Sequence, residues 1–575
     1  MTKVSPSKEQ IAAIIELFSR GNIQEAFENV NFLIKKYPNE SLLFNVRGAC
    51  YASLGDLDAS VLDYENSIDI SPGYYKAYFN LGGVLQELGK FDDAIHNLER
   101  AIMIEPNYAE AHNNLGNIYK DLERCDEAII SYEKAIIIKP DYLEAHYNLA
   151  NIFQDLNKMD AAIESYKKVL IIKPNFIEVL NNLGVILQNH SHTENAIEYF
   201  EEALLIDPDF AEAHNNLGNS FRELGQLDNA FNSYEKAISI KPEFTDANFN
   251  LAVIYQEYKE FDKAIRHYLK VIKANADYAP AHNNLGVIYK EIKKISKSVE
   301  SLEKAIFINP NYAEAHYNLG ASLQEFEYFE KALKHYEEAI AINPSYAEAF
   351  NNLGIVLKEL DRLDDAVKFY KQALAIKPGY AEAYNNLGNV LKSLGRPDEA
   401  VQYYKKTLTI SPNYSEAHNN LAITFMQLGL LDESVKSYRD ALTINPEYAE
   451  AHNNLGIVLN MLGLFDEASE SYKSALVLNN DYAEAYSNLG NLMVDLKRLD
   501  DAVIHYDRAF LLKPDIAFNL GNLIHTRLHL CNWDYYYEDV ALINKKIINK
   551  KRAIDPFALL ALIDNPELHK KAAEI

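Results

Sequence analysis

The residues of this chain whose type and spacing could do chemistry are asparagines that recur at one constant interval, beginning with Asn80 and Asn114. A side-chain amide offers a hydrogen-bond acceptor and donors together, so it can pair with a peptide unit whatever side chain that unit carries. A row of such amides on one helical face would hold an extended polypeptide by its backbone, independent of its sequence. We name this set the asparagine ladder; its thirteen members are Asn80, Asn114, Asn148, Asn182, Asn216, Asn250, Asn284, Asn318, Asn352, Asn386, Asn420, Asn454 and Asn488.

Two other origins of the ladder stay open: a structural role, as a cap or a bridge to the adjacent repeat, and inheritance through recent duplication. The position before the ladder varies among Asn113, Tyr147 and Phe249, so it has diverged where the ladder has not. Asparagine is a poor helix former, so its repetition needs a reason, and we interpret the ladder as a peptide-binding feature. Alanine is the better helix former, so we expect Asn→Ala changes to preserve or raise thermal stability. Val46 breaks the series, with Asn45 one place off, which leaves the first two units in question as peptide contacts.

The elements that position the ladder follow from a proline period. From Pro38 to Pro514, proline recurs at the same constant interval as the ladder, and Ala276 and Asn480 occupy the two vacant slots. A period this strict indicates a stack of one supersecondary unit rather than separate globular domains. Within residues 109–142, apolar residues spaced three and four apart predict two helices separated by a short polar break. We therefore predict an all-α solenoid of about fifteen helix-turn-helix units over residues 5–514.

The small residues indicate how these helices pack. Leucine follows every ladder asparagine, and the next position is glycine, as at Gly218, or in three repeats alanine. Glycine inside a helix costs roughly 1 kcal/mol relative to alanine, so we expect close approach of a neighbouring helix there. Tyr234 and its equivalents in the second helices are predicted to fill the space between repeats. Histidines such as His214 and His452 lie multiples of a full repeat apart, so we interpret them as core rings and predict no metal site and no catalytic residue.

Composition excludes several classes of function. The formal net charge of −27 argues against nucleic acid, which needs clustered Lys and Arg, and leaves solubility or a preference for basic or neutral peptides as its meaning. No apolar run approaches the ~18 residues of a membrane span, and the N-terminal sequence lacks the apolar stretch of a signal peptide. Cys50, Cys125 and Cys531 are odd in number and far apart, which fits a reducing compartment. We expect a cytoplasmic protein without membrane contact.

The repeat resembles the tetratricopeptide repeat in length, paired helices, Leu-Gly pair and terminal proline. That resemblance implies a right-handed superhelix whose first helices line a concave groove, and no particular chemistry. The ladder resembles the one in the repeat region of protein O-GlcNAc transferases, where asparagines lining the superhelix bind substrate polypeptide. It implies that the thirteen ladder asparagines are the peptide-binding residues. A clamp for a terminal carboxylate is disfavoured, because it needs a cationic set and the positions around the ladder are neutral or acidic.

The period ends after Pro514. Residues 518–521, Phe-Asn-Leu-Gly, repeat the signature three residues early, and no second helix follows in register. One interpretation of residues 515–575 is a helical cap, which terminal repeats require. The other is a resemblance, carried by the Trp-Asp sequence at 533–534 and the Pro-Phe-Ala-Leu-Leu sequence at 556–560, to the segment that joins repeats to the catalytic region in bacterial relatives of O-GlcNAc transferase.

Together the resemblances imply the substrate-presenting part of an O-GlcNAc transferase-like glycosyltransferase, truncated before its catalytic lobes. UDP-GlcNAc as donor and Ser or Thr hydroxyls as acceptors are implied by the family alone, and we expect no cofactor in these residues. The alternative is a stand-alone scaffold without enzymatic activity. A homodimer through the convex repeat face is a further expectation from the resemblance.

Overall fold

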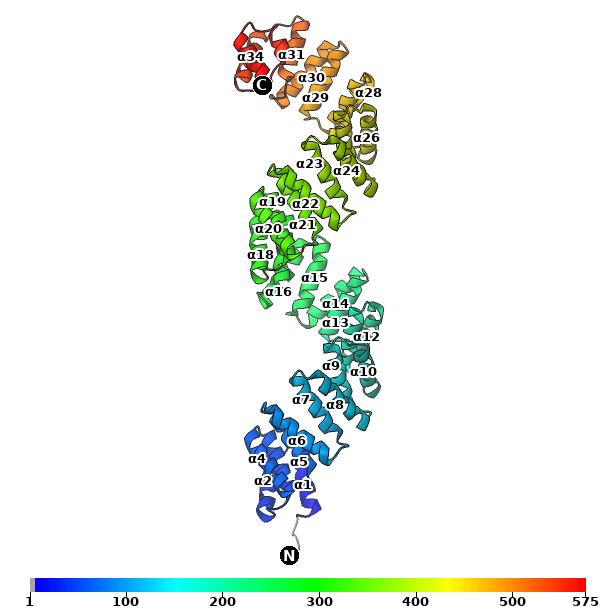
Figure 1. The fold of residues 1–575 in the computed structure, drawn as a ribbon, viewed down its shortest axis with the longest axis vertical. Helices are drawn as coiled ribbons and strands as arrows, with labels where there is room; N and C mark the ends of the chain where they lie inside the picture. Colours follow the sequence, from blue (N-terminus) through cyan, green and yellow to red (C-terminus); the bar gives the residue numbers. More distant parts are fainter. Residues whose placement is uncertain (1–5) are drawn as a thin grey trace. The chain divides into compact units, whose positions relative to one another are not determined.

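The computed structural model describes residues 6–575, and every regular element among them is an α-helix. The predicted all-α solenoid is thereby confirmed, while its predicted start at residue 5 lies outside the described residues. The chain divides into two compact units after Ala276, one of the two slots where the period lacks its proline. Within each unit, antiparallel helix pairs stack on one another in chain order (Figure 1).

The first unit consists of paired helices of 12–14 residues. They are α1 (Lys8–Ser19), α2 (Ile23–Lys36), α3 (Ser41–Ser53), α4 (Leu57–Ile70), α5 (Tyr75–Glu87), α6 (Phe91–Ile104), α7 (Ala109–Asp121), α8 (Cys125–Ile138), α9 (Leu143–Asp155), α10 (Met159–Ile172), α11 (Ile177–Asn189), α12 (Thr193–Ile206), α13 (Ala211–Glu223), α14 (Leu227–Ile240), α15 (Thr245–Glu257) and α16 (Phe261–Ala274).

The second unit continues the same alternation and ends in shorter helices. They are α17 (Ala279–Glu291), α18 (Ile295–Ile308), α19 (Ala313–Glu325), α20 (Phe329–Ile342), α21 (Ala347–Glu359), α22 (Leu363–Ile376), α23 (Ala381–Ser393), α24 (Pro397–Ile410), α25 (Ser415–Gln427), α26 (Leu431–Ile444), α27 (Ala449–Met461), α28 (Phe465–Leu478), α29 (Ala483–Asp495), α30 (Leu499–Leu512), α31 (Asn519–His529), α32 (Tyr536–Ile548), α33 (Pro556–Leu559) and α34 (Pro566–Glu574).

The short break inside each pair contains a residue in the left-handed conformation. Glycine fills this position in several repeats, as at Gly89 (φ 71°), because it adopts positive φ without steric cost. Elsewhere Glu123 (φ 58°) and Asp361 (φ 59°) adopt the same conformation. The turn therefore keeps one geometry throughout, whatever residue supplies it.

The helices of a pair meet where the helical glycine faces the aromatic residue of the second helix. A Cβ atom placed on Gly116 would lie 2.6 Å from the Cε1 atom of Tyr132, and one on Gly218 would lie 2.6 Å from that of Tyr234. Both tyrosine side chains are fully buried. The predicted close approach and the predicted aromatic filling are thus the two sides of one contact, in which the ring occupies the space a larger residue would need.

A buried tyrosine must also satisfy its hydroxyl. The hydroxyls of Tyr132, Tyr234 and Tyr404 donate to asparagine side chains three residues after the ladder position, at 2.7–2.9 Å. Ile355 occupies the equivalent position beside Tyr370, whose buried hydroxyl has no hydrogen-bond partner within the described residues. Where the asparagine is missing, another residue must accept this bond, as Gln324 does for the Tyr336 hydroxyl at 2.7 Å, and no residue does so for Tyr370 within the described residues.

Residues 515–575, which follow α30 and are called the cap from here on, pack differently from the repeats. The Gly521 N–H donates to the Ala553 carbonyl at 2.9 Å, and a Cβ atom on Gly521 would lie 2.6 Å from the Cγ1 atom of Ile554. Glycine here thus admits an irregular segment of the cap instead of a tyrosine ring. Leu520, Ile543 and Leu559 form part of a separate small core, which explains why the repeat period stops here.

The contrast between Tyr370 and Tyr404 yields a prediction. Tyr404→Phe removes a hydrogen bond and should lower the free energy of unfolding by about 0.5–1.5 kcal/mol. Tyr370→Phe removes a buried hydroxyl that has no partner and should preserve or raise stability. Urea denaturation, with hydrogen exchange in α22 and α24 to localise the effect, measures both. Equal destabilisation by the two changes would contradict the assignment of the Tyr404 bond.

Candidate polypeptide-binding face

The thirteen ladder asparagines occupy equivalent positions near the middle of the first helix of each pair, from Asn80 in α5 to Asn488 in α29. Twelve are half-buried, and Asn420 is 9% exposed. Their side chains therefore lie at the margin between the repeat core and the face of the first helices.

At least nine of the thirteen donate a side-chain hydrogen bond to the preceding repeat. Eight donate from Nδ2 to the Oδ1 atom of an asparagine in the first helix of that repeat, and Asn352 donates to the Tyr317 hydroxyl at 3.1 Å. The eight donors are Asn80, Asn148, Asn216, Asn250, Asn318, Asn386, Asn420 and Asn488, with distances of 2.9–3.3 Å. The bridge between adjacent repeats, which the sequence left open as an alternative, is present.

These bridges change the expected effect of removing a ladder residue. Asn385, which accepts the bond from Asn420, is 1% exposed. A buried acceptor without a donor lowers the free energy of unfolding by about 1–3 kcal/mol. This loss exceeds the gain from alanine's higher helix propensity. The expectation that Asn→Ala preserves stability is therefore replaced, for the bridging positions, by an expected loss. Six of the nine bridging amides still have a second N–H, whereas Asn148, Asn250 and Asn352 each make two hydrogen bonds from Nδ2. Peptide binding by the ladder therefore stays a prediction.

Two further rows run beside the ladder, and the sequence reasoning did not single them out. Six residues before each ladder asparagine stands an aromatic residue, from Tyr74 to Tyr482. Four residues before it stands an acid in eleven of the thirteen repeats, with Lys76 and Pro280 as the exceptions. Residues four apart share a helical face, so the acidic row lies on the ladder's side of these helices. Both rows recur at the repeat interval, so the period in the sequence was the signal that could have identified them.

Lysine side chains of the same chain neutralise part of the acidic row. Lys377 lies 2.7 Å from Glu348 and Lys513 lies 2.6 Å from Glu484. The hydrogen bond from Lys377 holds the pKa of Glu348 below its usual range. Burial, followed by the charge of Glu450, raises the pKa of Tyr448 to about 12. The face thus presents neutral tyrosines and ionised carboxylates at neutral pH.

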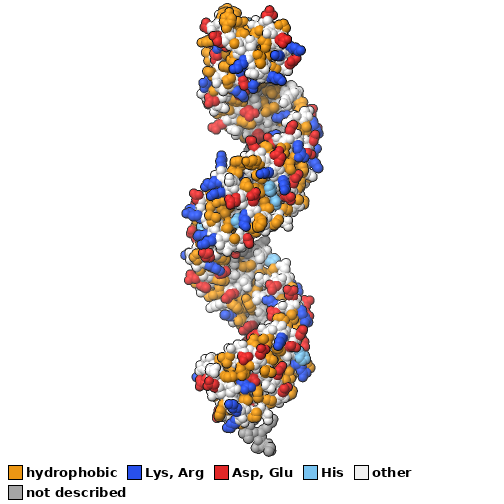
Figure 2. Space-filling model, turned by 90° about the vertical axis from the view of Figure 1, so that its left-hand side faces the viewer, with side chains coloured by type: hydrophobic (Ala, Val, Ile, Leu, Met, Phe, Trp, Pro, Cys, Tyr) orange, Lys and Arg blue, Asp and Glu red, His pale blue; other side chains and the backbone are white. Residues whose placement is uncertain are grey.

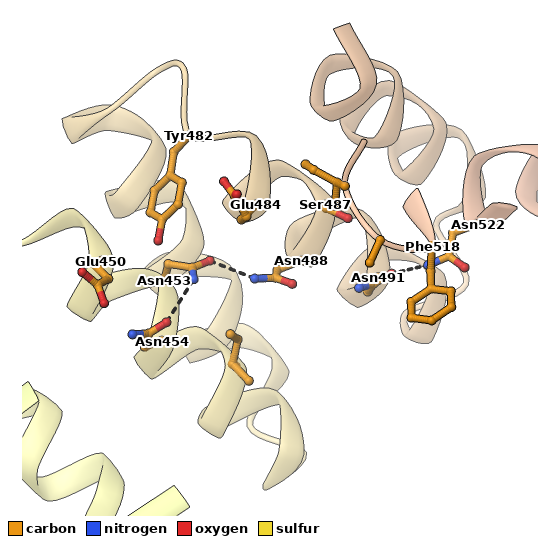
Figure 3. Close-up of a pocket in the computed structure, with 13 residues that line it drawn as sticks. Glu450, Asn453, Asn454, Tyr482, Glu484, Ser487, Asn488, Asn491, Phe518 and Asn522 are labelled. Carbon is orange, nitrogen blue, oxygen red and sulfur yellow. Dashed lines mark hydrogen bonds between the residues drawn. The ribbon is translucent and has the colours of Figure 1, made fainter. Parts of the chain in front are cut away.

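A cavity of about 560 Å³ opens on this face between α27, α29 and the start of the cap (Figure 3). Members of all three rows line it, together with Ile516 and Phe518 of the loop before α31. Asn453 connects the ladder members here, because its Nδ2 donates to Asn454 and its Oδ1 accepts from Asn488 at 3.0 Å. Such a lining offers hydrogen-bond donors, acceptors, negative charge and aromatic faces to one bound segment.

Asn522 extends the ladder beyond the thirteen predicted members. It stands one full repeat length after Asn488, lines the same cavity, and donates from Nδ2 to Asn491 Oδ1 at 3.1 Å. The sequence analysis missed it because the Asn-Leu-Gly signature begins early, at Asn519. Asn519 is instead buried and donates to the Tyr506 carbonyl. The strict period would have identified the right residue where the local motif did not.

Two of the repeat histidines contact the loop before their own helix. His214 Nε2 lies 3.0 Å from the Pro208 carbonyl oxygen, and His452 Nε2 lies 3.0 Å from that of Pro446. Both rings are half-buried, so their interpretation as core rings is wrong for these two. Each ring ties the first helix to the loop before it.

The chain matches family models of the tetratricopeptide repeat between residues 84 and 516, and it belongs to the tetratricopeptide repeat family. The matched ranges are 84–123, 116–157, 143–176, 177–210, 199–231, 218–258, 245–278, 288–325, 312–378, 347–413, 424–463, 459–496 and 483–516. Tetratricopeptide repeats imply a scaffold for protein–protein interaction.

Among individual proteins, the chain is 30% identical over 69 residues to the Hsp70-Hsp90 organizing protein of Triticum aestivum, over 12% of each chain. Three solved structures are similar over nearly their whole length and over a part or most of this chain. They are YrrB, a TPR protein with an unusual peptide-binding site (22% identity, 32% of this chain and 95% of that one, TM-score 0.30), the APC/C hetero-tetramer Cut9-Hcn1 (14%, 84% and 96%, 0.37) and MamA (32%, 30% and 96%, 0.28).

No helix within the described residues is both long and apolar enough to cross a membrane. On the face drawn in Figure 2, Lys and Arg side chains are interspersed with Asp and Glu side chains. The three cysteines are free thiols.

The bridging bonds predict that ladder positions differ in how much they contribute to the free energy of unfolding. Asn420→Ala should lower the free energy of unfolding by about 1–3 kcal/mol, because it leaves the buried Asn385 oxygen without a donor. Asn114 makes no side-chain hydrogen bond within the described residues, and Phe79 occupies the acceptor position of the preceding repeat. Asn114→Ala is therefore the matched control and should be neutral or stabilising. Urea denaturation of both variants tests this, and equal losses would refute the bridging role.

Proposed function

We propose that this protein is an interaction scaffold that binds extended polypeptides by their backbone along the face of the first helices. The observation that carries the proposal is the ladder itself, in which an asparagine amide recurs in thirteen consecutive repeats and most of these amides keep an N–H that the bridges do not use. A backbone in extended conformation presents its own donors and acceptors at regular intervals. Binding through them is independent of side-chain sequence, which suits a scaffold with several partners.

The rows beside the ladder restrict the partner's chemistry. Glu450 has no ion-pair partner within the described residues, whereas Glu484 in the same cavity is paired with Lys513. Together with the net charge of −27, this favours basic or neutral segments and opposes acidic ones. It also opposes nucleic acid, whose phosphates the same charges would repel. We place the scaffold in the cytoplasm, without membrane contact.

More specifically, we propose that the scaffold presents substrates to an O-GlcNAc transferase-like glycosyltransferase. Two features support this: the unbroken ladder and the resemblance of the segment around Trp533 to the start of that family's catalytic region. None of the similar proteins described above is a glycosyltransferase, so this part of the proposal rests on those residues. UDP-GlcNAc would then be the sugar donor, and Ser or Thr hydroxyls of the bound polypeptide would be the acceptors. The transfer would take place in catalytic lobes outside these 575 residues.

The alternative is a stand-alone scaffold without enzymatic activity. The reading frame after codon 575 separates the two: several hundred further codons encoding nucleotide-sugar-binding lobes support the enzyme, and a stop codon supports the scaffold. The purified chain of 575 residues should transfer no sugar from UDP-GlcNAc in either case. Turnover by this chain alone would overturn the assignment of catalysis to other residues.

We also propose self-association through the outer face of the second helices in the first unit. Four consecutive repeats expose a large apolar side chain at one position of α6, α8, α10 and α12. These residues are Met103, Ile137, Ile171 and Leu205, each at least 70% exposed. A large continuous apolar patch marks an interaction surface, and a second copy of the same face would cover these four side chains together.

The central test measures binding of fluorescently labelled, unstructured peptides of two unrelated neutral or basic sequences. Replacing Asn386, Asn420, Asn454 and Asn488 together by alanine should weaken both peptides at least tenfold, since each lost bond is worth about 0.5–1.5 kcal/mol. Because three of these positions bridge repeats, circular dichroism must confirm folding at the assay temperature.

A second variant separates binding from stability. Asn114 makes no side-chain hydrogen bond within the described residues, so Asn114→Ala alone should weaken binding about two- to tenfold without lowering the melting temperature. Replacing Asn97 and Asn229, which lie on second helices, is the control and should leave affinity unchanged. If both ladder variants bound the peptides as tightly as the wild type, the ladder would have a structural role only.

Self-association is tested by sedimentation velocity. Ile137→Asp with Ile171→Asp should shift the protein to the monomer, because the charges would be buried without partners in the interface. Phe307→Asp, at a similarly exposed position in the second unit, is the control and should have no effect. A wild-type protein that is monomeric at tens of micromolar would refute this part of the proposal.

A further inference from the structure

His525 and His529 lie one turn apart on α31, on a face that the repeats use for the ladder. Both side chains are exposed, and their ring centroids are 4.5 Å apart with the ring planes inclined by 62°. Residues four apart on a helix project from the same side. The two imidazoles therefore meet at one point of the surface, one turn after Asn522.

Because the cap departs from the repeat pattern, these two rings do not make the hydrogen bond that the repeats make at this position. In the preceding repeat, the position equivalent to His525 is Asn491, whose side chain accepts the hydrogen bond of the buried Tyr506 hydroxyl at 2.7 Å. At α31 the glycine position, Gly521, faces Ile554 and not a tyrosine ring. Neither His525 nor His529 makes a side-chain hydrogen bond within the described residues.

The other close histidine pair shows the difference. His316 and His335 lie with their Nδ1 atoms 3.3 Å apart, and His316 Nε2 contacts the Pro310 carbonyl oxygen at 3.1 Å. Both nitrogens of His316 are thus engaged, and its ring is buried. That pair joins two helices, whereas the pair on α31 keeps its ring nitrogens open to solvent.

Neutral imidazole is a preferred ligand of Zn²⁺, Cu²⁺ and Ni²⁺. Two histidines four residues apart on one helix are also the arrangement that holds zinc in metalloprotease helices, with metal–nitrogen bonds of about 2.0–2.1 Å. Partial desolvation of the ring, and next the charge of the neighbouring His529, lower the pKa of His525. His525 is therefore in its metal-binding, neutral form at neutral pH.

We propose that His525 and His529 chelate one divalent transition-metal ion at the end of the ladder face. Within the described residues no group of three or more His, Cys, Asp and Glu side chains is placed to share an ion, so water completes the coordination. The site should prefer Cu²⁺ over Ni²⁺ and Zn²⁺, following the usual order of divalent affinities. This inference is independent of polypeptide binding, because it uses only the two imidazoles.

The sequence predicted no metal site anywhere in the chain, and the spacing of the repeat histidines by whole repeats was one reason. His525 and His529, four residues apart, lie in the described segment where the repeat period has ended. The proposal departs from that prediction at these two residues and rests on the 4.5 Å separation of their rings.

The chain's only tryptophan provides the readout. Trp533 lies four residues after His529 and is exposed. Its fluorescence should fall saturably when the EDTA-treated, dialysed full chain is titrated with CuSO₄ or NiCl₂, with one ion per chain and a midpoint in the micromolar range. His525→Ala and His529→Ala should each raise the midpoint at least tenfold, because a single imidazole lacks the chelate. Acidification should weaken the quenching, because protons compete with the metal ion for imidazole nitrogens.

Two controls make the result specific. His190→Ala with His192→Ala removes an exposed pair two residues apart, which does not share a helical face, and should leave the titration unchanged. Cys531→Ser should also leave it unchanged, since Cys531 lies near Trp533 but is not a proposed ligand. Quenching that survives both histidine changes, or that disappears with Cys531→Ser alone, would overturn the proposal and assign the effect to adventitious binding.

Discussion

The contact between the helical glycine and the aromatic ring of the second helix is the constraint on which the repeats depend. At Gly116 and Gly218 a Cβ atom would lie 2.6 Å from a tyrosine carbon, so neither position admits a larger residue without displacing the ring. The ring in turn is fully buried, and its large apolar surface contributes much of the pair's stability. Because the same contact recurs in repeat after repeat, each pair repeats nearly the same geometry.

The buried ring brings a hydroxyl into the interior, and satisfying it organises the polar residues of the face. Asn117 and Asn219 accept from tyrosine hydroxyls, and ladder residues such as Asn148 donate to the same Asn117 oxygen. The polar network therefore begins in the core and ends at the face. The proposed peptide contacts and the bridges between repeats share the same side chains, so binding and stability are coupled at the ladder.

The cap shows what happens when the glycine finds another partner. Gly521 still lies in a close contact, but with Ile554 of an irregular segment held by the Phe518 and Gly521 N–H groups. The loop that this segment fixes closes one side of the cavity around Asn488 and Asn522. The tyrosine that would have paired with the position of His525 is absent, which leaves two imidazoles exposed. The end of the repeat pattern thus creates the one local environment on the described face that the repeats do not reproduce.

The sequence by itself determined the repeat unit, its helices, its turns and the position of the ladder, because period and residue type are local properties that stacking preserves. The proline period, the Leu-Gly pair and the glycine in the break each predict one feature of a pair, and all three are found. Only the tertiary structure decided what each ladder amide does. Whether Asn420 bridges and Asn114 does not depends on the residue at the acceptor position of the preceding repeat, which contacts the ladder only when the repeats stack. The cavity, the role of Asn522 and the pairing of His525 with His529 beyond the last tyrosine likewise follow from the cap's packing, which no period encodes.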